Sequence, residues 1–381
     1  MDYVKLKDVC AINMGQSPDS NSYNENGKGV PFFQGNADFG ERYPITRKWC
    51  SAPTKMAAPE DILISVRAPI GAMNYAKEDC CIGRGLAALT PDKSKVSPEY
   101  IFWLLKSKNE ELNSKGTGST FKAIGRKALE ETLVPDISLG KQTEYSTILE
   151  KVYGVILSRK QELQKLDELV KARFVEMFGD MYLNTMEWRE LHLETMADIV
   201  SGITKGRKIA GKQLTKVPYM AVSNVKDGYI DWTTVKTIEA TDQEINQYRL
   251  LPDDVLMTEG GDPDKLGRGA IIRTPLENCI HQNHIFRVRL DESHILPDYF
   301  AEYLKHQRAK RYFLGCAKQT TGIASINMKQ LKALPVLLPP LELQNEFSAF
   351  IRQIDKSKVV VQRALDEAQT LFDSLMQEYF G

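Results

Sequence analysis

The chain has 381 residues, of which 42% are hydrophobic and 26% are charged. This composition is typical of a globular protein, excludes a disordered chain and leaves room for about two domains. Because 50 basic residues balance 50 acidic residues, a body that is basic overall is also excluded, and any nucleic-acid partner must be held by local patches.

The six cysteines are scattered without a CxxC pair, which predicts reduced thiols and no disulfide framework. The first residues lack the apolar core of a signal peptide, and no run of about 18 apolar residues could span a bilayer. We therefore expect a cytoplasmic protein with no membrane partner.

Residues 1–136 combine strand-like and helix-like segments. The run from Ile62 to Val66 favours a strand, and turns rich in Gly, Pro and Asn separate such runs. Pro98 follows Ser97 at the start of a segment of bulky apolar residues, which is typical of a helix N-terminus. We predict a first mixed α/β domain over this segment.

A long helix is predicted from Lys141 to Phe178, within a spacer segment at 137–179. Apolar residues recur along it every seven positions and form a seam of Leu149, Ile156, Leu163 and Val170. At 1.5 Å per residue its 38 residues span about 57 Å. Since the remaining surface is polar and the seam is imperfect, this helix needs a partner helix or domain.

The same pattern follows a second time. Residues 180–338 contain the strand-like runs Val255–Thr258 and His284–Val288 and predict a second α/β domain. A second long helix is predicted from Leu343 to Phe380, within a spacer segment at 339–381. Its seam includes Ile351, Ile354, Leu365 and Phe372. The shared period predicts that the two helices pack as a coiled coil, with separate packing on the two domains as the alternative.

An internal repeat relates the two halves. Residues 124–179 align with 326–381 without a gap at an offset of 202, and both copies end in an acidic residue followed by Met-Phe-Gly or Tyr-Phe-Gly. Upstream the offset is 187 around Gly15 and Gly202, 193 around Pro59, and 198 at Cys81, which matches Cys279. The chain therefore consists of two variable modules on a common frame.

Searches for catalytic motifs fail. The sequence has no phosphate-binding loop, no HExxH and no GxSxG, and the glycines at 116 and 118 lack the third glycine of a dinucleotide-binding pattern. Cys279, His281 and His284 could share a face of a strand and suggest zinc, but no fourth ligand accompanies them. We predict no catalytic residue and no bound metal, and prefer a strand that faces solvent or DNA.

Several loops instead combine cations, amides and hydroxyls, which hold phosphates and recognise base edges. Taken singly, each is more often a solvated loop, but their equivalent places in the two modules favour DNA binding. The candidates are Arg47, Lys48, Arg67, Arg84, Ser119, Thr120, Phe121, Lys122, Lys205, Arg207, Lys208, Asn224, Arg268, His281, Gln282, Asn283, Lys318, Gln319, Thr320 and Thr321.

The repeat, the Pro-Pro-Leu-Glu-Leu-Gln segment at 339–344, the two heptad helices and the matching C-terminal motifs resemble the specificity subunits of type I restriction-modification systems. The resemblance covers essentially the whole chain. It implies two target-recognition domains related by a pseudo-twofold repeat and held apart by two antiparallel coiled-coil helices. Each domain would recognise one half of a bipartite, asymmetric sequence in double-stranded DNA.

The resemblance also implies a non-catalytic chain with several partners. Two modification subunits would methylate adenine with S-adenosylmethionine, and restriction subunits would use ATP and Mg²⁺. The base-reading residues differ among members, so the recognised bases do not follow from the resemblance. A scaffold whose helices recruit proteins is the alternative function, and a DNA-acting enzyme with an unrecognised site is a third.

Overall fold

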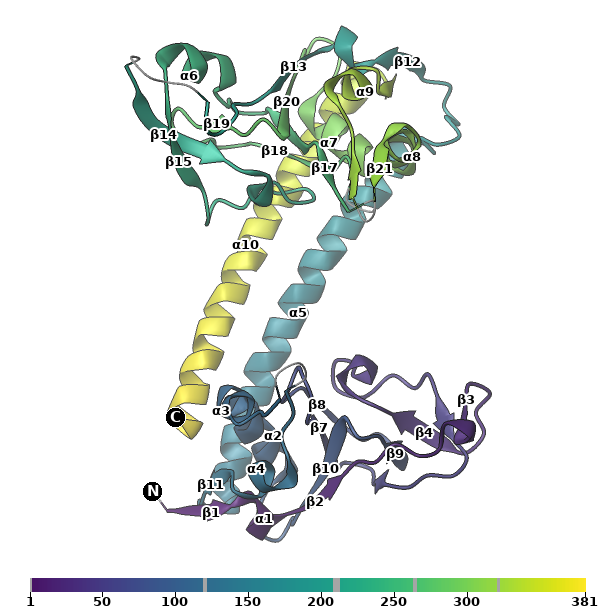
Figure 1. The fold of residues 1–381 in the computed structure, drawn as a ribbon, viewed down its shortest axis with the longest axis vertical. Coiled ribbons are helices and arrows are strands. Elements are labelled where there is room, and N and C mark those ends of the chain that lie inside the picture. Colours follow the sequence, from purple (N-terminus) through teal and green to yellow (C-terminus); the bar gives the residue numbers. More distant parts are fainter. Residues whose placement is uncertain (1, 119–121, 208–212, 263–265, 321–322) are drawn as a thin grey trace. The chain divides into compact units, whose positions relative to one another are not determined.

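The computed structural model describes residues 2–118, 122–207, 213–262, 266–320 and 323–381 (Figure 1). The chain forms two compact units. Unit 1 comprises residues 1–161 with 362–381, and unit 2 comprises residues 162–361. Each unit thus contains one predicted domain together with half of both long helices, so the helices are integral parts of the units.

Unit 1 is built on a four-stranded antiparallel sheet in the order β2-β10-β7-β8 and a second sheet in the order β3-β5-β4-β9-β6, while β1 pairs with β11. Its strands are β1 (Tyr3–Lys5), β2 (Cys10–Met14), β3 (Tyr23–Asn24), β4 (Val30–Phe33), β5 (Trp49–Cys50), β6 (Met56–Ala57), β7 (Ile62–Ser65), β8 (Met73–Tyr75), β9 (Cys80–Ile82), β10 (Leu86–Pro91) and β11 (Leu133–Pro135). Its helices are α1 (Leu6–Val9), α2 (Pro98–Ser107), α3 (Asn109–Ser114) and α4 (Arg126–Glu130), with 3-10 turns η1 (Ser20–Ser22) and η2 (Asn36–Asp38).

Unit 2 repeats this plan, with a four-stranded sheet β13-β20-β16-β18, two three-stranded sheets β15-β14-β19 and β17-β22-β21, and the pair β12-β23. Its strands are β12 (Arg189–His192), β13 (Ala197–Ser201), β14 (Thr215–Met220), β15 (Lys236–Ala240), β16 (Val255–Thr258), β17 (Gly260–Gly261), β18 (Gly269–Ile271), β19 (Ile280–His281), β20 (Ile285–Leu290), β21 (Lys318–Thr320), β22 (Ile323–Ser325) and β23 (Pro335–Leu338). Its helices are α6 (Asp242–Tyr248), α7 (Pro297–Lys305), α8 (Gln307–Cys316) and α9 (Met328–Lys332), with 3-10 turns η3 (Leu193–Thr195) and η4 (Val222–Asn224).

Strand register corrects one part of the predicted repeat. Phe32 pairs with Cys81 in unit 1, whereas its counterpart Tyr219 pairs with Ile280 in unit 2. The offset at this strand is therefore 199 and not 198, and Cys80 is the counterpart of Cys279. The difference matters because a slip of one residue moves each side chain to the opposite face of a strand.

Two long helices, α5 (Leu139–Phe178) and α10 (Leu341–Phe380), each contribute to both units. Within unit 1 the start of α5 lies beside the end of α10, because the rings of Tyr145 and Tyr379 stack 3.9 Å apart. Within unit 2 the end of α5 lies beside the start of α10, where the rings of Phe174 and Phe347 are 5.4 Å apart. The helices are therefore antiparallel in each unit, as predicted.

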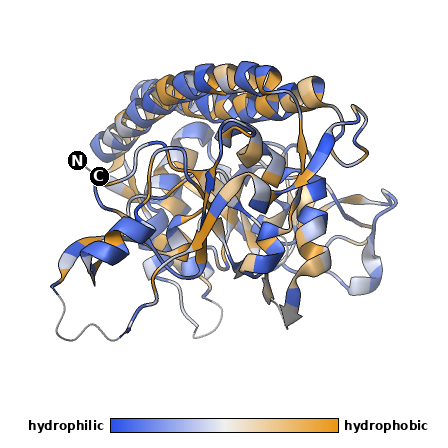
Figure 2. Cartoon of the chain, turned by 90° about the horizontal axis from the view of Figure 1, so that it is seen from above, coloured by the Kyte–Doolittle hydropathy of each residue, from blue (hydrophilic) through white to orange (hydrophobic). Residues whose placement is uncertain are grey.

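The predicted seams face these contacts. Leu149, Ile156, Val170, Ile354 and Phe372 are buried. Leu163, Ile351 and Leu365 are half-buried. Figure 2 shows hydrophilic and hydrophobic residues mixed along both helices, in contrast to the mostly hydrophobic central strands. In each unit most of these seam residues join a core cluster made of the domain and both long helices, and a continuous coiled coil stays a prediction.

A buried glutamine near the start of each long helix fastens it to its domain. The side chain of Gln142 accepts from the Ser97 N–H at 2.8 Å, and Gln344 accepts from the Leu296 N–H at 2.9 Å. Both amides also donate to backbone carbonyls of the preceding loops. This shared network explains why glutamine occupies both positions of the repeat, since a buried amide requires partners at both ends.

All six cysteines are free, as predicted. Burial raises the pKa of the counterparts Cys80 and Cys279 to about 12, so both are neutral thiols within the core. Among the described residues, no helix is long and apolar enough to cross a membrane.

Candidate nucleic-acid interface

Three segments form an exposed edge of unit 1, here called loop edge 1: residues 66–67 after β7, the turn 83–86 between β9 and β10, and residues 122–124. The Val66 N–H donates to the Gly85 carbonyl at 2.9 Å, and the Ile124 N–H donates to the Val66 carbonyl at 2.9 Å. These bonds hold the three segments side by side although they are distant in sequence. The edge brings together three of the predicted cations.

The cations of loop edge 1 are Arg67, Arg84 and Lys122, and all three are exposed. Among the described residues, no side-chain hydrogen bond or ion pair engages either guanidinium group. An unpaired, solvated guanidinium can bind a phosphate or the acceptor edge of guanine without first breaking an internal contact. The three cations are therefore accessible at this edge, and their contact with DNA stays a prediction.

Unit 2 has a corresponding loop edge 2, made of residues 259–260, the turn 282–285, and residues 324–326. The Glu259 N–H donates to the His284 carbonyl at 3.0 Å, and the Ile326 N–H donates to the Glu259 carbonyl at 2.8 Å. Here the edge presents amide and imidazole groups. The predicted residues Gln282 and Asn283 lie in its turn and are half-buried.

A contact that sequence patterns did not reveal lies beside this turn. The Nδ1 atom of His284 is 2.6 Å from a Glu259 carboxylate oxygen, and its Nε2 atom is 3.4 Å from the Nδ2 atom of Asn283. When Nδ1–H donates to Glu259, Nε2 accepts from the Asn283 amide. Glu259 and His284 thus orient Asn283, a role that only their spatial proximity could indicate.

Two predicted DNA contacts are wrong because their side chains are buried. Asn224 is 0% exposed, accepts from the Ala221 N–H at 2.9 Å, and donates to the Asp231 carbonyl at 2.9 Å. It holds the loop after β14, as Asp38 does after β4 by accepting from the Gln34 N–H at 2.8 Å. A residue that stabilises a loop in this way has no free group for a base.

His281 is also 0% exposed, and its ring nitrogens lie 3.1 and 3.3 Å from the carbonyls of Tyr248 and Val200. Burial lowers its pKa to about 4, so it is neutral near pH 7 and contributes no charge. Cys279, which suggested a metal site together with His281, is buried as well. Among the described residues, no group of three acidic, His or Cys residues is placed to hold a metal.

The remaining predicted cations differ in how many hydrogen bonds and ion pairs they form within the protein. Arg207 forms a two-pronged ion pair with Glu244, at 2.5 and 2.8 Å, which lowers the pKa of that carboxyl to about 2. Arg47 is exposed but donates to the Ala37 carbonyl at 2.8 Å. Lys48, Lys205 and Lys318 are exposed. Arg207 therefore serves first to fix its loop against α6.

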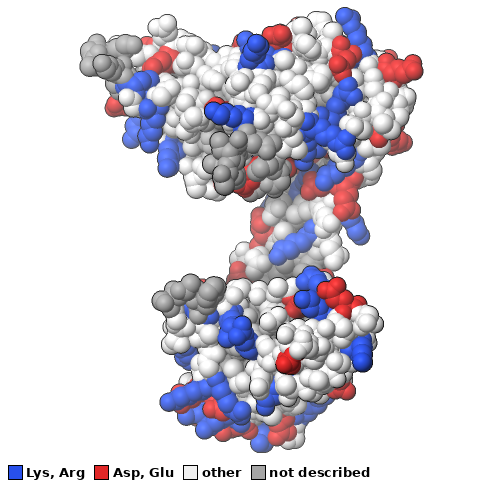
Figure 3. Space-filling view, turned by 45° about the vertical axis from the view of Figure 1, so that its right-hand side comes forward, with Lys and Arg blue, Asp and Glu red and all other residues white. Residues whose placement is uncertain are grey.

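Arg268 is half-buried beside the end of β16, where its carbonyl accepts from the Thr258 N–H at 3.3 Å. Other predicted residues, Ser119, Thr120, Phe121, Lys208 and Thr321, lie outside the described residues, as do the side chains of Gln319 and Thr320. On the face drawn in Figure 3, Lys and Arg side chains form several separate patches with uncharged surface between them. This pattern matches the expectation of local basic patches on a chain without net charge.

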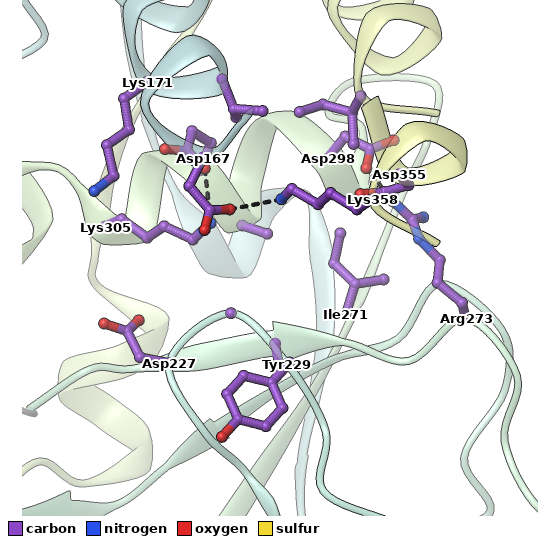
Figure 4. A pocket seen from close by; sticks show the side chains of 16 residues that line it. Asp167, Lys171, Asp227, Tyr229, Ile271, Arg273, Asp298, Lys305, Asp355 and Lys358 are labelled. Carbon is purple, nitrogen blue, oxygen red and sulfur yellow. Dashed lines mark hydrogen bonds and ion pairs between the residues drawn. The ribbon is translucent and has the colours of Figure 1, made fainter. Parts of the chain in front are cut away.

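Unit 2 also contains a pocket of about 520 Å³ between α7, β18 and the two long helices. Its walls mix both signs of charge, and Figure 4 shows the side chain of Lys358 reaching Asp167, at 2.6 Å. Asp298 is paired with Arg273 within it. The pocket lies apart from loop edge 2 along the chain and contains none of the predicted DNA-binding residues.

The chain is similar to several known proteins. A family model described as the type I restriction modification DNA specificity domain matches residues 1–168 and again 186–367. A type I restriction enzyme MjaX specificity subunit of Methanocaldococcus jannaschii is 41% identical over 160 residues, which is 42% of this chain and 38% of that protein. The type I restriction enzyme EcoKI specificity subunit of Escherichia coli K12 is 23% identical over 350 residues, or 85% of this chain and 74% of that protein.

A solved structure shows the same fold. The S subunit of a type I restriction-modification system from M. genitalium aligns over 100% of this chain and 96% of that chain, with a TM-score of 0.62 and 14% identity. The likeness confirms the predicted mixed α/β class with two domains.

Proposed function

Because this chain belongs to the family of type I restriction modification DNA specificity domains, we propose that it is the specificity subunit of a type I restriction-modification complex. Unit 1 recognises one half of a bipartite DNA target, and unit 2 recognises the other half. The observation that carries this proposal is that one scaffold occurs twice, with shared backbone hydrogen bonds at loop edges 1 and 2 but different side chains on them. Two half-sites of different sequence require such a pair of readers.

The long helices set the distance between the half-sites and dock two modification subunits. Leu169 and Leu371 occupy equivalent positions of α5 and α10 and are 47% and 51% exposed. Large apolar side chains that are exposed at matched helix positions favour contact with two copies of one partner. In unit 1, Leu371 lies in a shallow groove with Arg363, Glu367 and Thr370, whose charges would surround the apolar contact.

Methyl transfer and cleavage belong to the partner subunits, which bind S-adenosylmethionine, ATP and Mg²⁺. Support comes from the sequence, since none of the phosphate-loop, metalloprotease or nucleophile motifs occurs in it. The chain acts where the chromosome is, in the cytoplasm of the cell. Its own contribution is to position the partners at one DNA sequence.

Mapping of methylated adenines in cells that express the chain with its modification subunit tests the function. We expect one bipartite motif with a fixed spacer. Replacing residues 181–325 by the equivalent module of another specificity subunit should change one half of that motif and leave the other half unchanged. The reciprocal replacement of the first module is the matched control. A change in both halves from one exchange, or no bipartite motif with the parent chain, would refute the proposal.

A further inference from the structure

Loop edges 1 and 2 share four backbone hydrogen bonds, although the Arg84 N–H donates to the Ser17 hydroxyl and the Asn283 N–H donates to the Ile203 carbonyl. Gly83 donates to the Phe33 carbonyl at 2.8 Å and accepts from the Leu86 N–H at 3.0 Å. Gln282 donates to the Met220 carbonyl at 3.0 Å and accepts from the Ile285 N–H at 2.9 Å. Gly83 and Gln282 are therefore counterparts. The next residue of each turn, Arg84 in unit 1 and Asn283 in unit 2, occupies one common position.

A glycine holds each turn against the neighbouring strand end. A Cβ atom on Gly15 would lie 2.2 Å from the Gly83 carbonyl oxygen, and one on Gly202 would lie 2.0 Å from the His281 carbonyl oxygen. Only glycine allows so close an approach of two backbones. This close approach explains the identity of both glycines in the repeat, although Gly15 meets the turn at Gly83 and Gly202 meets it one residue earlier, at His281.

The chemistry at the common position differs. Arg84 carries an exposed guanidinium, whereas Asn283 carries a neutral amide that contacts His284. Phosphates are the same in every DNA sequence, so a position that serves only to bind phosphate has no reason to lose its charge in one unit. Bases differ between half-sites. A change of chemistry on a conserved backbone therefore favours base recognition.

The two side chains match different bases. Arginine pairs with the O6 and N7 acceptors of guanine, whereas asparagine pairs with the N6 donor and N7 acceptor of adenine. The contact with His284 uses one Nδ2 hydrogen of Asn283, which leaves the other hydrogen and the Oδ1 atom for adenine.

Resting on the proposed function, we propose that Arg84 and Asn283 are equivalent base-reading residues: Arg84 recognises a guanine in the half-site of unit 1, and Asn283 recognises an adenine in the half-site of unit 2. His284 and Glu259 are positioning residues for Asn283. In unit 1 their counterparts are Gly85 and Val66, which have no polar side chain. Arg84 needs no such partner, because every nitrogen of a guanidinium is a donor and its orientation is not ambiguous.

The test compares methylated-adenine motifs of Arg84→Ala, Arg84→Lys and Asn283→Ala with that of the parent chain, each expressed with its modification subunit. Arg84→Ala should relax one guanine in one half-site, lowering discrimination there by roughly 5- to 150-fold, and Asn283→Ala should relax one adenine in the other half-site by a similar factor. Arg84→Lys keeps the charge but loses the two-pronged geometry, so it should also relax the guanine.

Lys48→Ala and Lys205→Ala are matched controls, one in each unit, and should lower methylation at all sites without changing the motif. Thermal unfolding of the purified variants checks that they fold. Uniform loss of methylation in the Arg84 and Asn283 variants, or relaxation at a different base, overturns the inference while the proposed function stands. If the parent chain directs no bipartite motif, the proposed function itself fails.

Discussion

At the scale of single residues, the two units share buried polar contacts that hold the frame together and differ at the turn that presents a side chain. Gln142 and Gln344 make the same contacts in both units, whereas Arg84 and Asn283 differ on the same turn. A buried amide is constrained by every group around it. A side chain at the surface of a turn is constrained mainly by the molecule it binds, so the two copies of the repeat have different residues there.

His281 makes the free energy of unfolding of unit 2 depend on pH. Burial lowers its pKa from 6.5 to about 4, so below pH 6.5 the unfolded chain binds a proton that the folded chain does not. The stability from the neutral ring is therefore fully present above pH 6.5 and is lost as the pH falls toward 4, by at most about 3 kcal/mol. Urea unfolding between pH 7.5 and pH 4.5 measures this loss.

The variant His281→Gln should show a smaller loss over the same pH range, although it is less stable at pH 7.5. His192→Gln, at an exposed position, is the control and should behave like the parent chain. If the free energy of unfolding of all three proteins depends equally on pH, His281 is not the cause of the loss of stability.

At the scale of elements, aromatic rings fill the junction between α2 and the long helices in unit 1. The corresponding junction in unit 2, between α7 and the long helices, contains a pocket. The ring of Trp103 lies 5.3 Å from Tyr153 and 5.5 Å from Phe372. The repeat places smaller or charged residues at the corresponding sites, where the pocket of Figure 4 lies. These counterparts are Glu302 for Trp103, Asp355 for Tyr153 and Val170 for Phe372.

Removing a side chain at this junction should therefore cost more in unit 1. Phe372 and Val170 are equally buried, at 6% and 7% exposure. Phe372→Ala should lower the free energy of unfolding by about 3–5 kcal/mol, because it leaves a cavity among aromatic rings. Val170→Ala removes less volume beside an existing pocket and should cost clearly less. Urea unfolding of both variants measures the difference, and equal losses would show that the open junction is packed as tightly as the filled one.

At the scale of the whole molecule, α5 and α10 run from one unit into the other, and the unit boundary divides both, at 161–162 and at 361–362. If these helices set the spacer, lengthening both should lengthen the DNA target. Four residues inserted after Gln161 and four after Val361 add about 6 Å to each helix and nearly preserve its seam. At about 3.4 Å per base pair, the spacer should grow by one or two base pairs with both half-sites unchanged.

Methylated-adenine mapping measures the spacer directly. An insertion in α5 alone is the control, since it shifts one seam against the other and should reduce assembly with the modification subunit. An unchanged spacer in the double insertion would mean that the helices do not set the distance.

The sequence by itself determined the features that depend on local periodicity and on the repeat: two mixed α/β modules, two long helices with seven-residue seams, and the absence of a disulfide framework. Leu149 and Phe372 were placed correctly because a heptad pattern repeats over many turns and averages out single exceptions. The tertiary structure alone decided which loop residues reach the surface. Asn224 and His281 look like DNA-binding residues in sequence, but Asn224 is buried within its own loop and His281 is buried against Tyr248 and Val200. The register that makes Asn283 the counterpart of Arg84 likewise depends on pairing between remote strands, because local pattern cannot distinguish registers that differ by one residue.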